Sequence, residues 1–165
     1  MRNVAFIDGQ NVHMSTKSCD VPWEIDLQAF RIYLLEKYHV DEAHYFIGYF
    51  QSHYAYVYEK IVKAGFKLHF REHNSAMVGI KKGNVDSDVI FQVMKMLCIK
   101  TDFEKVVLVS GDGDYKILVD FLIEQNKFAM ILFPNRKFAS SLYKKLSRKY
   151  FAYLEESAIR KKIGG

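Results

Sequence analysis

Short runs of consecutive apolar residues alternate along the chain with longer segments in which apolar residues recur every three or four positions. Runs of this kind, bounded by polar or turn-forming residues, are typical of strands that are buried on both faces of a parallel sheet. They predict strands at residues 4–7, 44–49, 66–70, 106–109, 129–133 and 150–154.

The segments between these runs have the three-to-four-residue period of amphipathic helices. They predict helices at residues 27–38, 54–64, 85–99, 117–122 and 140–146, and a long loop at 72–84. Alternating strands and helices form right-handed crossovers, which place helices on both faces of a mainly parallel sheet. We therefore expect an α/β fold in one domain, residues 1–157, followed by a flexible tail at 158–165.

The composition indicates the cellular location of the protein more than its function. The chain has 165 residues, half of them hydrophobic, and no apolar stretch approaches the roughly 20 residues that a membrane span needs. Its two cysteines, Cys19 and Cys98, form no disulfide framework, and no signal peptide precedes the first strand, so we expect a cytoplasmic protein without membrane contact. A net charge of +5 suits a polyanionic partner such as nucleic acid, and equally an ordinary protein surface.

Acidic residues follow two of the predicted strands directly. Asp8 comes after the run at 4–7, and Asp112 and Asp114 come after the run at 106–109. Ligands bind beyond the carboxyl ends of the strands in open parallel sheets. The sequence therefore predicts that these carboxylates meet at one sheet edge.

A third acidic segment opens the helix predicted at 85–99. Asp86 shares a helical face with Ile90 and Val93, which predicts that it points inward, whereas Asp88 shares a face with Lys95 and is expected to be more exposed. A buried carboxylate needs a partner, because an isolated charge is costly to desolvate. A metal ion is one such partner.

Each acid also has a simpler explanation as a helix cap, a first-turn residue or a turn residue. Several carboxylates at one edge, however, repel one another unless a cation neutralises them, and oxygen-only ligands favour Mg²⁺ or Mn²⁺. Two neighbouring polar residues have open roles. Asn11 is expected to orient a carboxylate, water or substrate, or to cap a helix, and Ser110 to bond the Asp8 carboxylate or to belong to a turn.

Three blocks in this order resemble the NYN domain family of PIN-like ribonucleases, in its LabA-like bacterial branch: FIDGQN at 6–11, KGNVDSD at 82–88 and VSGDGD at 109–114. The resemblance implies a three-layer PIN-like (Rossmann-like) fold and metal-dependent cleavage of RNA to 5′-phosphate and 3′-hydroxyl ends. It makes Asp8, Asp86, Asp112 and Asp114 the metal-binding and catalytic acids, with Asp88 as a further acid, and Asn11 matches the family asparagine.

The surroundings of these blocks suggest how a substrate is held. Lys81 and Lys82 precede Asp86 and are expected to grip the nucleic-acid backbone, while a second basic group is either a binding surface or a solvated face. Tyr56 falls off the apolar stripe of its helix, where it would stack on a base or join a homodimer interface. The second basic group consists of Arg136, Lys137, Lys144, Lys145 and Arg148.

Two other functions remain open at the level of sequence. One is a non-catalytic RNA-binding or regulatory module of the same fold. The other is a metal-dependent phosphoester hydrolase that acts on small nucleotides. Haloacid-dehalogenase phosphatases also place Asp after the first strand, but they need a second Asp where this chain has Gln10.

Overall fold

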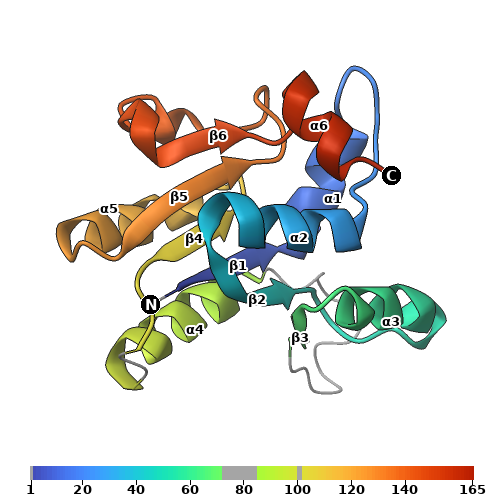
Figure 1. Ribbon diagram of the computed structural model, residues 1–165, viewed down its shortest axis with the longest axis horizontal. Helices are drawn as coiled ribbons and strands as arrows, with labels where there is room; N and C mark the ends of the chain where they lie inside the picture. Colours follow the sequence, from blue (N-terminus) through green and yellow to red (C-terminus); the bar gives the residue numbers. More distant parts are fainter. Residues whose placement is uncertain (1, 72–84, 100–101) are drawn as a thin grey trace, which may run out of the picture.

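The computed structural model describes residues 2–71, 85–99 and 102–165 (Figure 1). Within them, an all-parallel sheet of six strands runs in the order β3-β2-β1-β4-β5-β6. The strands are β1 Asn3–Asp8, β2 Val40–Phe46, β3 Lys67–His69, β4 Val106–Val109, β5 Phe128–Phe133 and β6 Phe151–Tyr153. The mixed α/β fold with a mainly parallel sheet is confirmed.

Helices cover both faces of the sheet and make it the middle of three layers (Figure 1). The helices are α1 Gly9–Lys17, α2 Leu27–Tyr38, α3 Ala55–Lys63, α4 Asp86–Ile99, α5 Lys116–Glu124 and α6 Ser157–Ile163. Helices α1, α2, α3 and α6 contribute to the hydrophobic core on one face, and α4 and α5 to the core on the other. The described residues include no helix with the length and apolar character required to cross a membrane.

The central strands are buried as their apolar runs predict. In β1, Val4 and Phe6 belong to the core beneath α4 and α5, whereas Ala5 and Ile7 belong to the core beneath α1 and α2. All four side chains are buried because each face of the strand lies against helices. Strand β4 has the same bounds as the run at 106–109 that predicted it.

Helix α1 is not predicted from the sequence, because Asp8-Gly9 resembles a turn and the residues after it are largely polar. In the structure the Asp8 carboxylate accepts a hydrogen bond from the backbone N–H of Asn11 (3.0 Å). This is the N-cap interaction that starts a helix. The same carboxylate thus ends β1 and begins α1.

The prediction of a flexible tail at 158–165 is wrong for most of this segment. Residues Ser157–Ile163 form α6, which packs on α2, and Ile163 is fully buried. Two backbone bonds hold its end, one from Asp26 to Ile163 (2.7 Å) and one from Gly165 to Glu24 (3.0 Å). The buried surface of Ile163 offsets the entropy lost in ordering this segment.

Two smaller boundaries also differ. Strand β2, Val40–Phe46, begins and ends earlier than the predicted strand at 44–49. The buried Val40 is followed by the exposed Asp41, so the start of the strand is not a continuous apolar run. The helix predicted at 140–146 is only the 3₁₀ turn η4, Ser141–Tyr143. The predicted loop at 72–84 lies outside the described residues.

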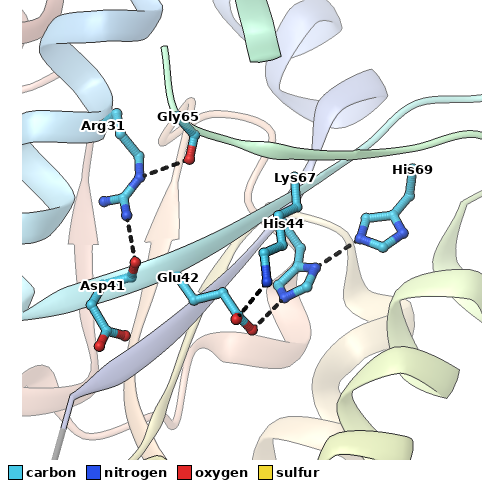
Figure 2. Close-up of polar contacts among 7 residues, drawn as sticks. All are labelled: Arg31, Asp41, Glu42, His44, Gly65, Lys67 and His69. Atoms are coloured by element: carbon cyan, nitrogen blue, oxygen red, sulfur yellow. Dashed lines mark hydrogen bonds and ion pairs between the residues drawn. The ribbon is translucent and has the colours of Figure 1, made fainter. Parts of the chain in front are cut away.

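Side chains attach the short edge strand β3 to β2 (Figure 2). A hydrogen bond of 2.7 Å joins His44 Nδ1 to His69 Nε2, and the Glu42 carboxylate contacts both His44 Nε2 (2.8 Å) and Lys67 Nζ (2.7 Å). At the opposite end of β3, Arg31 Nε donates to the carbonyl of Gly65 (3.2 Å). These bonds supplement a ladder of only three residue pairs.

The His44–His69 contact predicts a dependence of stability on pH. Desolvation, and then the charges of His44 and Lys67, lower the pKa of His69 from 6.5 to about 4. A lowered pKa means that the folded state favours the neutral ring, so its stabilisation is present above pH 6.5 and is lost as the pH falls towards 4. We expect a loss of about 1–2 kcal/mol, because a pKa unit corresponds to about 1.4 kcal/mol and the ring is partly exposed.

Thermal unfolding of the wild type and of His69→Gln between pH 7 and pH 4 measures this loss. His69→Gln keeps a polar side chain that does not titrate in this range, so its melting temperature should fall less steeply. Parallel curves for the two proteins would contradict the assignment to His69.

Candidate metal site at the carboxyl edge of the sheet

Three carboxylates meet where β1 and β4 end. Asp8 is the last residue of β1, Asp86 is the first residue of α4, and Asp112 directly precedes the 3₁₀ turn η3, Gly113–Tyr115. Each offers one oxygen, and these oxygens all lie within 4.8 Å of one another. The convergence expected from the ends of the strands and from the face of the helix is present in the structure.

Asp8 is the most enclosed of the three, with 3% of its surface exposed. Beyond its bond to Asn11, it accepts hydrogen bonds from the hydroxyls of Tyr115 (3.0 Å) and Ser110 (3.5 Å). Burial raises the pKa of the Asp8 carboxyl, and the nearby charge of Asp112 adds to this, although its three hydrogen bonds act in the opposite direction. The site therefore holds a carboxylate whose negative charge is poorly solvated.

Tyr115 is a site residue that the sequence did not reveal. It is fully buried, and its hydroxyl donates to Asp8. Burial is the main cause that raises the pKa of Tyr115 far above its usual range. The charges of Asp8 and Asp86, and the hydrogen bonds to both carboxylates, raise this pKa further. The available signal was its position directly after the acidic block that ends at Asp114, in a segment otherwise consisting of glycine and aspartate.

The loop that carries Asp112 is held by one hydrogen bond within the loop and by two from other parts of the chain. The backbone N–H of Asp112 donates to Ser110 Oγ (3.1 Å), and the N–H of Gly111 donates to the side-chain oxygen of Asn11 (2.9 Å). The hydroxyl of the buried Tyr143 donates to the carbonyl of Asp112 (2.6 Å). Asn11 and Ser110 thus both position the acids in the structure.

The other predicted site residues lie farther out. Asp114 is exposed and is not in the group of converging oxygens, although its backbone N–H donates to the Asp112 carboxylate (2.9 Å). Asp88 is half-buried on the first turn of α4, as its helical face indicates. Lys81 and Lys82 lie outside the described residues.

The converging group fits a hard divalent cation. Carboxylate oxygens are preferred ligands of Mg²⁺ and Mn²⁺. Asp8 and Asp86 are both buried, 3% and 7% exposed, so their negative charges are poorly screened by water. Holding two such charges next to Asp112 is costly unless a cation neutralises them. The residues present are therefore suited to such an ion.

Removing the Tyr115 hydroxyl should weaken metal binding without unfolding the protein. We expect Tyr115→Phe to reduce affinity for Mn²⁺ about 10- to 100-fold, because the hydroxyl orients two ligands from outside the ligand set. Isothermal titration with Mn²⁺ measures the affinity, and Tyr38→Phe is a matched control that removes the hydroxyl of a buried tyrosine of α2, away from the acids. Equal affinity in Tyr115→Phe and wild type would contradict this role.

Comparisons with known proteins agree with the fold. A model of the NYN domain family matches residues 3–155. A protein of unknown function from Vibrio parahaemolyticus has a similar structure, with a TM-score of 0.78 and 19% identity over 94% of this chain and 93% of that one. The bacteriophage T5 D15 flap endonuclease, solved with DNA and metal ions, matches with a TM-score of 0.48 and 11% identity over 87% and 60%. None of the curated proteins compared with the chain matches it.

Proposed function

Because this chain belongs to the NYN domain family, we propose that it is a Mg²⁺- or Mn²⁺-dependent ribonuclease that hydrolyses RNA phosphodiester bonds. One observation carries the proposal: oxygens of Asp8, Asp86 and Asp112, from three separate elements, lie within 4.8 Å of one another at the carboxyl edge of the sheet. A group of this kind suits a cation that binds a phosphate and a water molecule.

In this proposal Asp8, Asp86 and Asp112 hold the cation, and the remaining residues hold these three in place. When bound, the cation supplies charge neutralisation at the phosphate and lowers the pKa of a bound water. Tyr115 orients the Asp8 and Asp86 carboxylates, while Ser110 and Asn11 fix the loop of Asp112. The exposed Asp114 and the half-buried Asp88 are assigned to contacts with water or substrate.

The second basic group, which consists of Arg136, Lys137, Lys144, Lys145 and Arg148, follows β5 in a segment that lies close enough to the acids to serve the same reaction. Its segment is joined to the Asp112 loop by the bond from the backbone N–H of Ser140 to the carbonyl of Gly111 (2.9 Å) and by the hydroxyl of Tyr143. Lys144 and Lys145 directly follow Tyr143 and are exposed. We assign these two lysines to contacts with the phosphates of the RNA. We also propose that the protein is cytoplasmic and makes no contact with a membrane.

A labelled single-stranded RNA, incubated with the protein in Mn²⁺, Mg²⁺ or EDTA, tests the proposed activity. We expect cleavage in either metal, none in EDTA, and products with 5′-phosphate ends. Retention of the RNA without cleavage in any metal would identify a non-catalytic binding module. Cleavage that persists in EDTA would contradict a metal-dependent reaction.

Metal binding should also raise thermal stability, whichever substrate is used. A ligand at about 100 times its dissociation constant stabilises the folded state by about 2.7 kcal/mol. We therefore expect Mn²⁺ to raise the melting temperature of the wild type by several degrees, and to have little effect on Asp86→Asn. Equal shifts in both proteins would place the bound metal elsewhere.

A further inference from the structure

An exposed cluster of three aromatic rings lies beyond the ends of β2 and β3. It is formed by Phe50, Tyr58 and Phe70, whose ring centroids are 4.8–5.5 Å apart. Phe50 is 55% exposed and Phe70 39% exposed, while Tyr58 is half-buried. We call these three residues the aromatic patch.

The register of the sheet places the aromatic patch on the same edge as the acids. Asp8 pairs with Phe46 on β2, and Phe46 pairs with His69 on β3. Phe70 is thus one residue past the rung of the ladder that holds Asp8. Two strand spacings separate them across the sheet, about 10 Å.

Hydrogen bonds join the segments that carry the aromatic patch. The backbone N–H of Ile47 donates to the carbonyl of His69 (3.0 Å), and that of Arg71 donates to Gly48 (3.1 Å), so the two loops are joined. The N–H of Gln51 donates to the Tyr58 hydroxyl (3.0 Å) and attaches the first loop to α3. Below the patch, the bonds in Figure 2 tie β3 to β2, and the His69 ring stacks on Phe46 with centroids 4.5 Å apart.

The chemistry around the aromatic patch favours an anionic, ring-bearing partner. His53 and Tyr54 precede α3 with their rings in contact, and the cationic residue Arg71 directly follows Phe70. Tyr56, whose predicted exposure is confirmed, lies with Lys60 on a different face of α3 from Tyr58. Exposed aromatic rings next to cationic groups are the components of single-stranded nucleic-acid sites, where bases stack and phosphates meet positive charge.

We propose that the aromatic patch stacks unpaired bases of a single-stranded RNA whose scissile phosphate lies at Asp8, Asp86 and Asp112. This inference rests on the proposed ribonuclease function and defines its substrate as single-stranded. The bases of a duplex are already stacked on one another and cannot reach the patch without being unpaired. A single strand offers them at once, which gives the protein a preference for unpaired RNA.

Binding in EDTA tests this inference separately from cleavage. Fluorescence anisotropy with a labelled 20-nucleotide single-stranded RNA compares the wild type with Phe50→Ala and with Phe50→Ala/Phe70→Ala. Stacking is worth about 1–3 kcal/mol per base, which corresponds to about a 5- to 150-fold change in affinity. We expect about tenfold weaker binding in the single variant, a larger loss in the double variant, and recovery in Phe50→Trp.

Phe91→Ala is the matched control, because Phe91 is an exposed phenylalanine of α4 outside the patch. It should bind RNA as the wild type does. We also expect the wild type to bind the single strand more tightly than a duplex of the same sequence. Circular dichroism and melting temperature verify that each variant is folded.

The outcomes separate this inference from the proposed function. Wild-type affinity in Phe50→Ala/Phe70→Ala overturns the inference, even if the protein cleaves RNA. Sedimentation that shows loss of a dimer in these variants, with unchanged RNA affinity per protomer, makes the patch a subunit interface and also overturns it. Patch-dependent binding without cleavage in any metal supports the stacking of single-stranded RNA on the patch and contradicts the proposed ribonuclease instead.

Discussion

Asp8→Asn is expected to abolish RNA cleavage and, in EDTA, to make the protein more stable than the wild type. Cleavage is lost because an amide is a much poorer ligand for a hard divalent cation than a carboxylate. We expect a fall in rate of at least about 10³-fold, on the scale of removing a catalytic electrostatic group. Stability rises because the substitution removes a buried charge but keeps the oxygen that accepts from Asn11.

The direction of the stability change follows from the raised pKa of Asp8. A raised pKa means that the folded state favours the protonated carboxyl, so the contribution to stability is present at low pH and is lost as the pH rises through the folded pKa. At neutral pH the metal-free wild type therefore carries the cost of a buried charge. The variant does not carry it.

Melting temperatures in EDTA and in Mn²⁺, together with cleavage rates, measure both effects. Asp112→Asn should lose cleavage to the same extent with a smaller gain in stability, because Asp112 is only half-buried. Asp102→Asn, at an exposed position that precedes β4 at the opposite edge of the sheet, is the matched control and should change neither property. A fully active Asp8→Asn enzyme would remove Asp8 from the metal site.

The sequence predicted the positions of the acids because each depends on local structure. Asp8 and Asp112 follow apolar runs that end where the buried strands end, and the helical period points Asp86 inward. These inferences require only that parallel strands end at one edge. The inward face of Asp86 is confirmed by its burial.

The groups that hold the acids in place could not be predicted in the same way. The bond from Tyr115 to Asp8 joins residues 107 positions apart, and the bond from Tyr143 to the carbonyl of Asp112 depends on how η4 packs against the Asp112 loop. Neither contact follows from period or propensity. Helix α1 was missed for a related reason, because an Asp-Gly pair predicts a turn as readily as a helix cap.

Gly9 shows how closely the site depends on packing. A Cβ atom added at Gly9 would lie 2.5 Å from Tyr45 Cε1 and 2.6 Å from the backbone oxygen of Phe46. The oxygen belongs to the sheet, so it cannot rotate away as the end of a side chain would. Helix α1, which begins at Gly9 and is capped by Asp8, therefore lies directly against the end of β2.

We expect Gly9→Ala to destabilise the protein by about 2–3 kcal/mol, in the upper part of the range for overpacked positions. It should also reduce cleavage at least tenfold, because moving α1 away from β2 moves the Asp8 carboxylate. Gly111→Ala is the matched control, since a Cβ there meets its nearest atom, Ala139 Cα, at 3.4 Å. Urea unfolding and cleavage rates of both variants measure these effects. Equal stability of the two variants would show that the end of β2 yields to the added methyl group.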